Sequence, residues 1–208
     1  MKKNILSINH LNSIYLNQKH AEAYFKYIQT NIINLKEQKL VKSLFPELSS
    51  KKCLEIGCAG AIYSKAMLNC NARKVDSLDS SAAMIKIAKE STKSEVNYHH
   101  QDINLEFHLK DKYDFICASY VLHYSNNLRK TLTNILTLLN PKGILIFTVP
   151  NPQKFNQEEK QLYLGEDQLA TTFYNHSKEN YFTILTPLGT VMKSESNQDI
   201  FIVKFQRK

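Results

Sequence analysis

A run of small residues and an aspartate could together bind a small molecule: they are GCAGA at 57–61 and Asp79. The run follows the apolar segment Lys52–Ile56, and Asp79 ends the next apolar segment. Small residues let the backbone approach a ligand, and an acid at the end of the following strand can accept hydrogen bonds from ribose hydroxyls. A P-loop is excluded because GxxxxGK[ST] is absent, and GxGxxG is absent too. A nucleoside site is favoured, while an ordinary turn between a strand and a helix stays open.

Apolar strand-like segments alternate with segments of helical periodicity in the middle of the chain. The expected strands are Lys52–Ile56, Lys74–Leu78, Val96–His99, Tyr113–Ala118 and the run ILIFTV at 144–149. The expected helices between them are Ala61–Leu68, Ser80–Glu90 with Ser80 as its N-cap, and Leu128–Leu139. Because strands buried on both faces lack polar alternation, this pattern predicts a parallel sheet with helices on both faces.

The flanking regions follow other patterns. Residues 17–44 predict one helix, since apolar side chains recur near the helical period. Residues 151–176 are polar with a few aromatic side chains, and a helix at Ser177–Leu185 follows. Two late strands, Gly189–Lys193 and Asp199–Phe205, would fit a hairpin added to the sheet. We expect one domain over 1–208, with a helical cap at 1–50, a βα core at 51–150, a short cap at 151–176, and a helix and hairpin at 177–208.

The composition bears on the compartment and on partners. The 208 residues include four cysteines and carry a formal net charge of +8. The sequence contains no apolar run of about 18 residues, so no membrane span is expected. The N-terminus lacks the apolar region of a signal peptide. We therefore expect a cytoplasmic protein whose cysteines are reduced thiols. No ligands at zinc-binding spacing occur, so no metal is expected. The lysines are spread along the chain, which favours solvated helix faces over a nucleic-acid-binding stripe.

Further motifs accompany the turn and Asp79. The set comprises LEIGCAGA at 54–61, VDSLDSSAAMIKIAK at 75–89, HHQDI at 99–103, YDFICASYVLHYS at 113–125 and LLNPKGILIFTVPNP at 138–152. With these motifs in this order, the chain resembles the class I S-adenosylmethionine-dependent methyltransferases, and within them the small type 11-like domains. The resemblance covers about Tyr15 to Lys208. The resemblance implies an α/β, Rossmann-like, doubly wound sheet of seven strands, mostly parallel with a C-terminal antiparallel strand. It also implies an enzyme that uses S-adenosylmethionine, with S-adenosylhomocysteine as product.

The resemblance further implies which residues bind that cofactor. Glu55 would engage the methionine amino group, Asp79 the ribose diol and Asp102 the adenine amine. The other expected positions border these groups or contribute backbone, and they are Gly57, Cys58, Ala59, Ser80, Met84, Ile103, Ala118 and Ser119. Plainer alternatives stay open, since Asp79 could cap a helix, Asp102 could be a turn residue and Glu55 could pair with a lysine.

The turn departs from the family pattern at two glycine positions, which are Ala59 and Ala61 here. Ala61 is expected to begin a helix and to be tolerated. Ala59 would be strained by roughly 1 kcal/mol if its φ were positive. A second interpretation is therefore kept, in which the chain is a cofactor-binding module without catalysis that supports a partner protein.

The sequence says less about the molecule that accepts the methyl group, the acceptor, than about the cofactor. Candidate catalytic residues are His123, which follows the fourth strand, and Tyr24 in the N-terminal helix. Aromatic side chains expected near the acceptor are Phe155, Tyr163, Phe173 and Tyr174. We expect methyl transfer to an O, N or C atom of a small or medium organic molecule, with tRNA or another RNA as the alternative that the charge supports. The short cap could be closed by a partner subunit, so a homodimer is considered.

Overall fold

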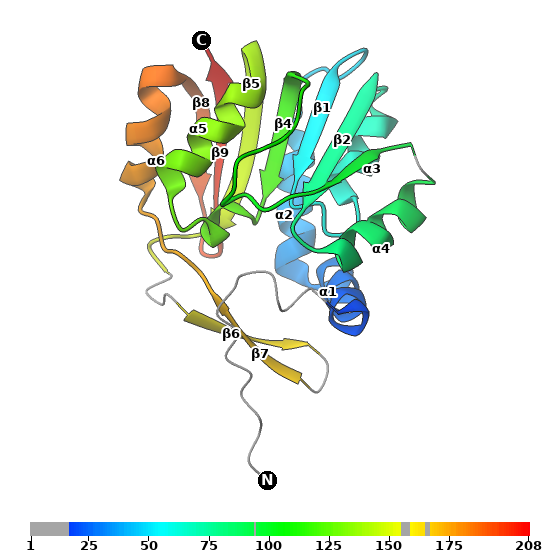
Figure 1. Ribbon diagram of the computed structural model, residues 1–208. Helices are drawn as coiled ribbons and strands as arrows, with labels where there is room; N and C mark the ends of the chain where they lie inside the picture. Colours follow the sequence, from blue (N-terminus) through cyan, green and yellow to red (C-terminus); the bar gives the residue numbers. More distant parts are fainter. Residues whose placement is uncertain (1–16, 94, 155–158, 165–166) are drawn as a thin grey trace.

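Seven strands form one sheet, and helices cover both of its faces (Figure 1). The strands are β1 (Lys52–Ile56), β2 (Lys74–Asp79), β3 (Asn97–His100), β4 (Tyr113–Ser119), β5 (Leu139–Pro150), β8 (Gly189–Ser196) and β9 (Ile200–Arg207). Their order is β3-β2-β1-β4-β5-β9-β8. β1 to β5 run parallel, and β9 pairs antiparallel with both β5 and β8. The computed structural model describes residues 17–93, 95–154, 159–164 and 167–208. The predicted mostly parallel sheet with an antiparallel C-terminal strand is confirmed.

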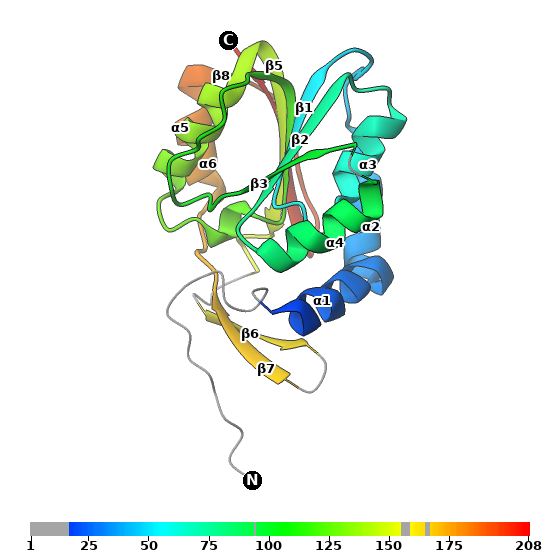
Figure 2. The same cartoon turned by 45° about the vertical axis from the view of Figure 1, so that its right-hand side comes forward.

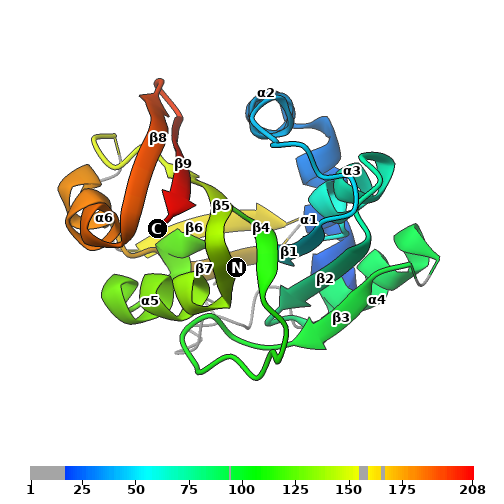
Figure 3. The ribbon, with the colours of Figure 1, turned by 90° about the horizontal axis from the view of Figure 1, so that it is seen from above.

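The helices form a layer on each side of the sheet (Figure 3). They are α1 (Gln18–Thr30), α2 (Ile32–Ser43), α3 (Ile62–Asn69), α4 (Ala82–Thr92), α5 (Leu128–Leu138) and α6 (Lys178–Leu185), with short 3-10 helices η1 (Leu122–Tyr124) and η2 (Thr186–Leu188). Within the described ranges, none of these helices has both the length and the apolar character needed to cross a bilayer.

Successive side chains of each central strand enter two different cores. On β4, Ile116 packs in the core under α5 and α6, and Cys117 packs in the core under α2 and α3. This alternation follows from the two-residue period of a strand. Because both faces are covered, both sets of side chains are apolar, which explains the continuous apolar runs in the sequence.

The N-terminal helical region is two helices rather than one. The prediction of a single helix over 17–44 is wrong, because the chain breaks at Asn31, which has φ −69° and ψ 127°. The Asn31 side chain accepts hydrogen bonds from the N–H groups of Ile33 and Asn34, at 3.0 and 3.2 Å, and so caps α2. Ile32, one of the apolar residues of the predicted helix, starts α2 and is 62% exposed.

The carboxyl ends of the parallel strands meet at one edge of the sheet. α1 lies below this edge, next to a two-stranded hairpin of β6 (Glu159–Leu164) and β7 (Asp167–Thr172) (Figures 1 and 2). Sequence analysis did not anticipate this hairpin within the polar segment 151–176. The side chains of Phe155 and Tyr163, which were expected near the acceptor, lie outside the described part of the chain.

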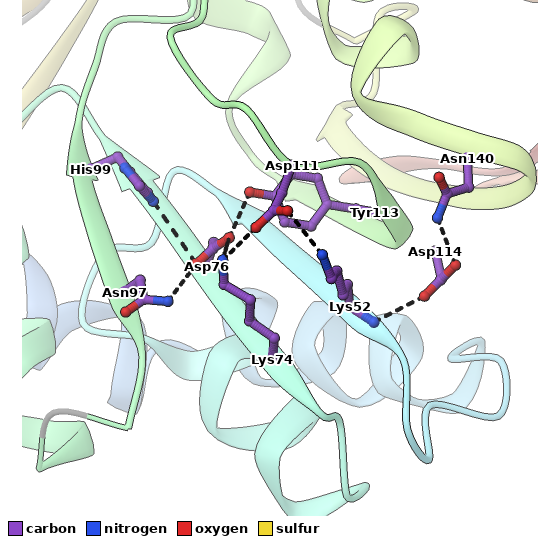
Figure 4. Close-up of polar contacts among 9 residues, drawn as sticks. All are labelled: Lys52, Lys74, Asp76, Asn97, His99, Asp111, Tyr113, Asp114 and Asn140. Carbon is purple, nitrogen blue, oxygen red and sulfur yellow. Dashed lines mark hydrogen bonds and ion pairs between the residues drawn. The ribbon is translucent and has the colours of Figure 1, made fainter.

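A polar cluster occupies the opposite edge, near the amino ends of β1, β2 and β4 (Figure 4). Asp76 is 2% exposed and accepts hydrogen bonds from the Tyr113 hydroxyl, at 2.6 Å, and from Asn97 Nδ2, at 2.8 Å. Asp111 pairs with Lys52 and with Lys74, at 2.8 and 2.5 Å. The cluster joins neighbouring strands far from the carboxyl edge and is therefore structural.

The four cysteines carry free thiols, as expected. Cys53, Cys58 and Cys117 are buried, whereas Cys70 is exposed. Burial raises the pKa of the Cys53 thiol to about 12, so this group is an apolar filler rather than a nucleophile.

Candidate functional site

A cavity opens at the carboxyl ends of β1, β2 and β4, where the strand order reverses direction. It holds about 660 Å³ of space, solvent at its mouth included, which suits a small-molecule site. Ligands of doubly wound sheets bind in this crevice. We call it the strand-end cavity. Its walls are formed by Tyr24, Gly57, Ala59, Leu78, Asp79, Ser80, Met84, Gln101, Asp102, Ile103, Asn104, Ser119, Tyr120, Val121 and Tyr124.

The turn after β1 presents its backbone to this cavity. Gly57 has φ +74°, and a Cβ at this position would lie 3.0 Å from Val121 Cγ2, so no side chain fits easily. The N–H groups of Gly57 and Cys58 donate to the carbonyl of Leu78, at 2.8 and 3.2 Å. These bonds tie the turn to the end of β2 and leave the Gly57 backbone facing the cavity.

Both alanines of the turn adopt left-handed backbone conformations, with φ +36° at Ala59 and +66° at Ala61. The prediction that Ala61 begins a helix is wrong, because α3 starts at Ile62 and Ala61 is its N-cap without a side-chain hydrogen bond. A non-glycine residue in this conformation is strained by roughly 1–2 kcal/mol. The turn thus carries strain at two positions rather than at Ala59 alone.

Helix α1 covers the turn from outside. A Cβ at Gly60, where φ is +99°, would lie 2.2 Å from Phe25 Cε2, so the Phe25 ring packs directly on this glycine. Ala21 packs with Met84 in a small apolar cluster, and Tyr24 lies in the cavity wall. The N-terminal helix is therefore part of the site and not a remote cap.

Asp79 places its carboxylate in the wall of the cavity. Its Oδ1 accepts a hydrogen bond from the Ser81 N–H at 2.9 Å, and its Oδ2 accepts one from the Ala59 N–H at 3.2 Å. Burial raises the pKa of Asp79, and these two hydrogen bonds oppose the rise. With about 9% of its surface exposed, the carboxylate retains lone pairs for hydroxyl donors.

Ser80 lies in the cavity wall but does not cap α4. The N-cap is Ser81, whose Oγ accepts from the Met84 N–H at 3.1 Å. The prediction of Ser80 as N-cap is therefore wrong by one residue. The shift has a simple cause, because Asp79 forms a short turn with the Ser81 N–H and delays the helix.

Asp102 and Ile103 form the wall beyond β3. Asp102 Oδ1 accepts from the Asn104 N–H at 2.9 Å and from Asn104 Nδ2 at 3.1 Å. Asn104 Nδ2 also donates to the carbonyl of Tyr124 at 3.2 Å, which links this loop to η1. A carboxylate beside a buried isoleucine suits a flat heterocycle that carries an exocyclic N–H.

Three expected cofactor residues lie behind the wall instead of in it: Glu55, Cys58 and Ala118. Glu55 caps the start of α3, since its carboxylate accepts from the N–H groups of Tyr63 and Ser64, at 3.1 and 2.8 Å, and from Ser64 Oγ at 2.5 Å. Burial raises the pKa of Glu55 to about 7. Direct contact with a ligand in the cavity would require this network to open.

A second cavity adjoins the first and holds about 1020 Å³, solvent included. We call it the aromatic cavity. Its walls are formed by Tyr24, Tyr27, Asn31, Ile33, Asn34, Tyr120, His123, Tyr124, Pro150, Lys154, Phe173, Gln198 and Asp199. Tyr24, Tyr120 and Tyr124 belong to both cavities, so the two spaces meet at these rings.

The two expected catalytic residues come together in the aromatic cavity. Tyr24 borders both cavities, whereas His123 borders the aromatic cavity but not the strand-end cavity. The His123 ring packs against Tyr124 and Phe173, with ring centroids 4.2 and 4.4 Å apart. Tyr174, another expected aromatic, lines a small hollow on the other side of His123. In the described ranges, no three His, Cys, Asp or Glu side chains are grouped so as to hold a metal ion.

Comparison with known proteins assigns a family. A family profile described as "Methyltransferase domain" matches residues 24–185. The chain belongs to this methyltransferase family. The match spans the α1 residues of the site, the whole parallel sheet and α6, and it confirms the resemblance found in the sequence.

Individual relatives of this methyltransferase are distant. A Haemophilus influenzae protein described as "Uncharacterized protein" is 27% identical over 184 residues, which cover 83% of this chain and 72% of that protein. The malonyl-[acyl-carrier protein] O-methyltransferase of Bacillus cereus is 24% identical over 147 residues, which cover 65% of this chain and only 54% of that protein. Among solved structures, the N-methyltransferase NodS of Bradyrhizobium japonicum with S-adenosyl-L-homocysteine superimposes with a TM-score of 0.66 at 19% identity, covering 92% of this chain and 99% of that one.

The structure also adds residues to the walls of the strand-end cavity that sequence reasoning missed. Tyr120 lies at the junction of the two cavities with φ +47°, an unusual conformation for a bulky residue and one that often marks a functional position. Its place two residues after the expected fourth strand was the available signal. Gln101 and Asn104 flank the motif residues Asp102 and Ile103, and this proximity could have suggested them.

Proposed function

We propose that this chain is an S-adenosylmethionine-dependent methyltransferase that acts on an O, N or C atom of a small or medium organic acceptor. The observation that carries the proposal is the junction of the strand-end cavity with the aromatic cavity at Tyr24, Tyr120 and Tyr124. One cavity offers carboxylates to a nucleoside, and the other offers aromatic walls to an organic acceptor.

The cofactor would lie along the strand-end cavity. Asp79 would accept from the ribose hydroxyls and Asp102 from the adenine amine, while Met84 and Ile103 pack on the base. The amino-acid end would then extend past the Gly57 turn towards Ser119 at the end of β4. This orientation uses the carboxylates of the cavity wall for hydroxyl and amine donors and the glycine for close backbone approach.

Methyl transfer depends mainly on how the protein aligns the acceptor atom with the methyl group. The bound sulfonium supplies the reactive methyl group. The protein has to hold the acceptor atom in line with that group and exclude water, and such alignment can lower the barrier by several kcal/mol, up to about 7–11. Tyr24 and Tyr120, at the junction, would position the acceptor. His123 would take a proton where the acceptor carries one, because its ring lies in the wall of the aromatic cavity.

The relatives do not agree on the acceptor atom. The Bacillus cereus protein is named as an O-methyltransferase, and NodS is named as an N-methyltransferase. The aromatic cavity combines rings with Lys154 and Asp199 at its border, which suits an organic molecule with both apolar and polar parts. We therefore keep O, N and C acceptors within one proposal.

The first test is calorimetric titration with S-adenosylhomocysteine. Wild-type chain should bind one molecule per chain, and Asp79→Ala should weaken binding by about tenfold or more, because a charged acceptor of hydrogen bonds is lost. Asp111→Ala is a matched control, since it removes a partly exposed carboxylate at the opposite edge of the sheet and should leave the affinity unchanged. Absence of binding to the wild-type chain would refute the proposal.

A further inference from the structure

Glu37 of α2 is a buried carboxylate that the site described above does not use. It is 1% exposed, and its Oε1 accepts hydrogen bonds from Ser119 Oγ and Thr148 Oγ1, both at 2.7 Å. Its Oε2 accepts from the Tyr63 hydroxyl. Among the described residues, no cationic side chain forms an ion pair with it. A buried carboxylate held by neutral hydroxyls is costly, because no described side chain of opposite sign is in contact with it. Lys42 favours the charged form only weakly and does not offset the burial, which raises the pKa of Glu37.

Ser119 connects this carboxylate to the strand-end cavity. Ser119 lies in the cavity wall at the end of β4, and its hydroxyl donates its proton to Glu37. A hydroxyl has one proton and two lone pairs. The Ser119 hydroxyl lies 2.7 Å from Glu37 Oε1 and 3.2 Å from the Tyr63 hydroxyl, so its single proton is directed at the nearer carboxylate. The Ser119 oxygen then keeps a lone pair for a donor in the cavity, and a cationic donor would gain most from the negative charge behind it.

The position of Ser119 fits the amino-acid end of the cofactor. The strand order β2-β1-β4 puts Asp79 on one side of the Gly57 turn and Ser119 on the other. A ligand with its ribose at Asp79 therefore extends its tail over Gly57 towards Ser119. That tail carries an ammonium group, and the attached sulfonium is positive as well.

The same network also holds the junction between the cavities. Thr148 Oγ1 donates to Glu37 and accepts from the Tyr120 N–H at 3.0 Å, and the Thr148 carbonyl accepts from that N–H at the same distance. Tyr120 keeps its left-handed conformation under this restraint. Glu37 thus acts on two consecutive wall residues, Ser119 and Tyr120, from behind the wall.

We propose that Glu37 is the positioning residue for the amino-acid end of the cofactor, orienting the Ser119 hydroxyl to accept from the ammonium group and placing a negative charge behind that contact. This inference rests on the proposed function. It gives Glu37 the electrostatic role that the family resemblance implied for Glu55, whose carboxylate is occupied by the start of α3. Burial raises the pKa of Glu37, and a cation beside Ser119 would favour its ionised form.

The test compares two ligands that share a nucleoside and differ in the amino-acid tail. The tail of S-adenosylhomocysteine carries an ammonium group and a carboxylate, and 5′-methylthioadenosine carries neither; loss of a negative charge at Glu37 can weaken only the ammonium contact. For Glu37→Gln, calorimetric titration should show S-adenosylhomocysteine weakened by about tenfold or more, and 5′-methylthioadenosine changed by less than about twofold. A purely structural role would weaken both ligands alike, because both need the same folded nucleoside site.

Two further variants sharpen the result. Glu55→Gln is the matched control, since it neutralises the other buried glutamate of this region and should not change the ratio of the two affinities. Ser119→Ala should reproduce the selective loss and serves as the second variant should Glu37→Gln fold poorly. Equal loss of both ligands in Glu37→Gln, or a selective loss in Glu55→Gln instead, would overturn the inference alone. A wild-type chain that binds neither ligand would overturn the proposed function, and the inference with it.

Discussion

Replacing Ala59 by glycine should stabilise the protein. Ala59 has φ +36° and lies half-buried in the cavity wall, so its methyl group contributes little burial. A left-handed alanine is strained by roughly 1–2 kcal/mol relative to a right-handed one. Glycine removes that strain but gives the unfolded chain extra freedom, which offsets about 0.4–1 kcal/mol. The net expectation is a gain of about 0.5–1 kcal/mol in the free energy of unfolding.

The same change at Ala61 should have almost no net effect. Ala61 has φ +66°, so the strain relieved is similar. Its methyl group, however, is fully buried against Ile85 and Ala88. Loss of one buried methyl group costs about 0.8 kcal/mol, which cancels the remaining gain. The two positions therefore separate backbone strain from side-chain packing within one turn.

Urea unfolding at equilibrium measures these differences, with Ala66→Gly as the matched control. Ala66 lies in the middle of α3, where glycine should destabilise the protein by about 1 kcal/mol. The expected order of stability is Ala59→Gly above wild type, Ala61→Gly close to wild type and Ala66→Gly below it. A loss at Ala59→Gly as large as that at Ala66→Gly would show that the turn stores no strain at Ala59 and would refute the reasoning.

Three further predictions concern the supporting structure. Gly60→Ala should destabilise the protein by about 1–3 kcal/mol, since its Cβ would lie 2.2 Å from Phe25 Cε2. Adding Phe25→Ala to Gly60→Ala should recover part of that loss in urea unfolding. No recovery in the double variant would contradict the contact. Asp76→Ala should lower the free energy of unfolding by about 2–4 kcal/mol, because the Tyr113 hydroxyl loses its buried acceptor (Figure 4). The affinity for S-adenosylhomocysteine should stay within about twofold of wild type. A larger change in affinity would contradict the separation of the two edges of the sheet. Because burial raises the pKa of Glu55 from 4.5 to about 7, its stabilising contribution is complete below the lower value and is lost as pH rises through the upper one. Between pH 4.5 and 7.5, the free energy of unfolding of wild type should therefore fall by up to roughly 3 kcal/mol relative to that of Glu55→Gln. Urea unfolding at both pH values measures this change. A difference between the two proteins that does not change with pH would argue against the raised pKa.

The parts of the fold that follow from local patterns were predictable from the sequence. β1 was predicted with its observed bounds, and β2, β3, β4 and β9 within two residues of theirs, because continuous apolar runs bounded by turns are typical of buried strands. β5, however, begins five residues before the predicted run, and β8 ends three residues after its predicted end. Asp79 was expected in the site because it ends an apolar strand, whereas Asp102 was expected there from the family resemblance. Both lie in the cavity wall, because the carboxyl ends of parallel strands converge at one edge.

Other features depend on tertiary contacts that no local pattern reveals. Asn31 breaks the N-terminal helical region because its side chain caps α2, although the apolar period runs through it. Tyr120 and Ala61 take left-handed conformations against their intrinsic preference, so the surrounding contacts must impose them. Glu37 gave a weak signal, since it lies four residues before the buried Val41 on the same helix face, where an apolar residue would be expected.

The contacts of α1 and α2 argue that the N-terminal helices and the strand-end cavity form one unit. Phe25 of α1 packs on Gly60 of the turn, and Glu37 of α2 binds Ser119 at the end of β4. Tyr24 then borders both cavities. Any movement of these helices would therefore change the turn, the Ser119 hydroxyl and the junction together. For this reason a substitution in α1 or α2 that alters the aromatic cavity should also change cofactor affinity, and acceptor specificity and cofactor binding should not vary independently in this protein.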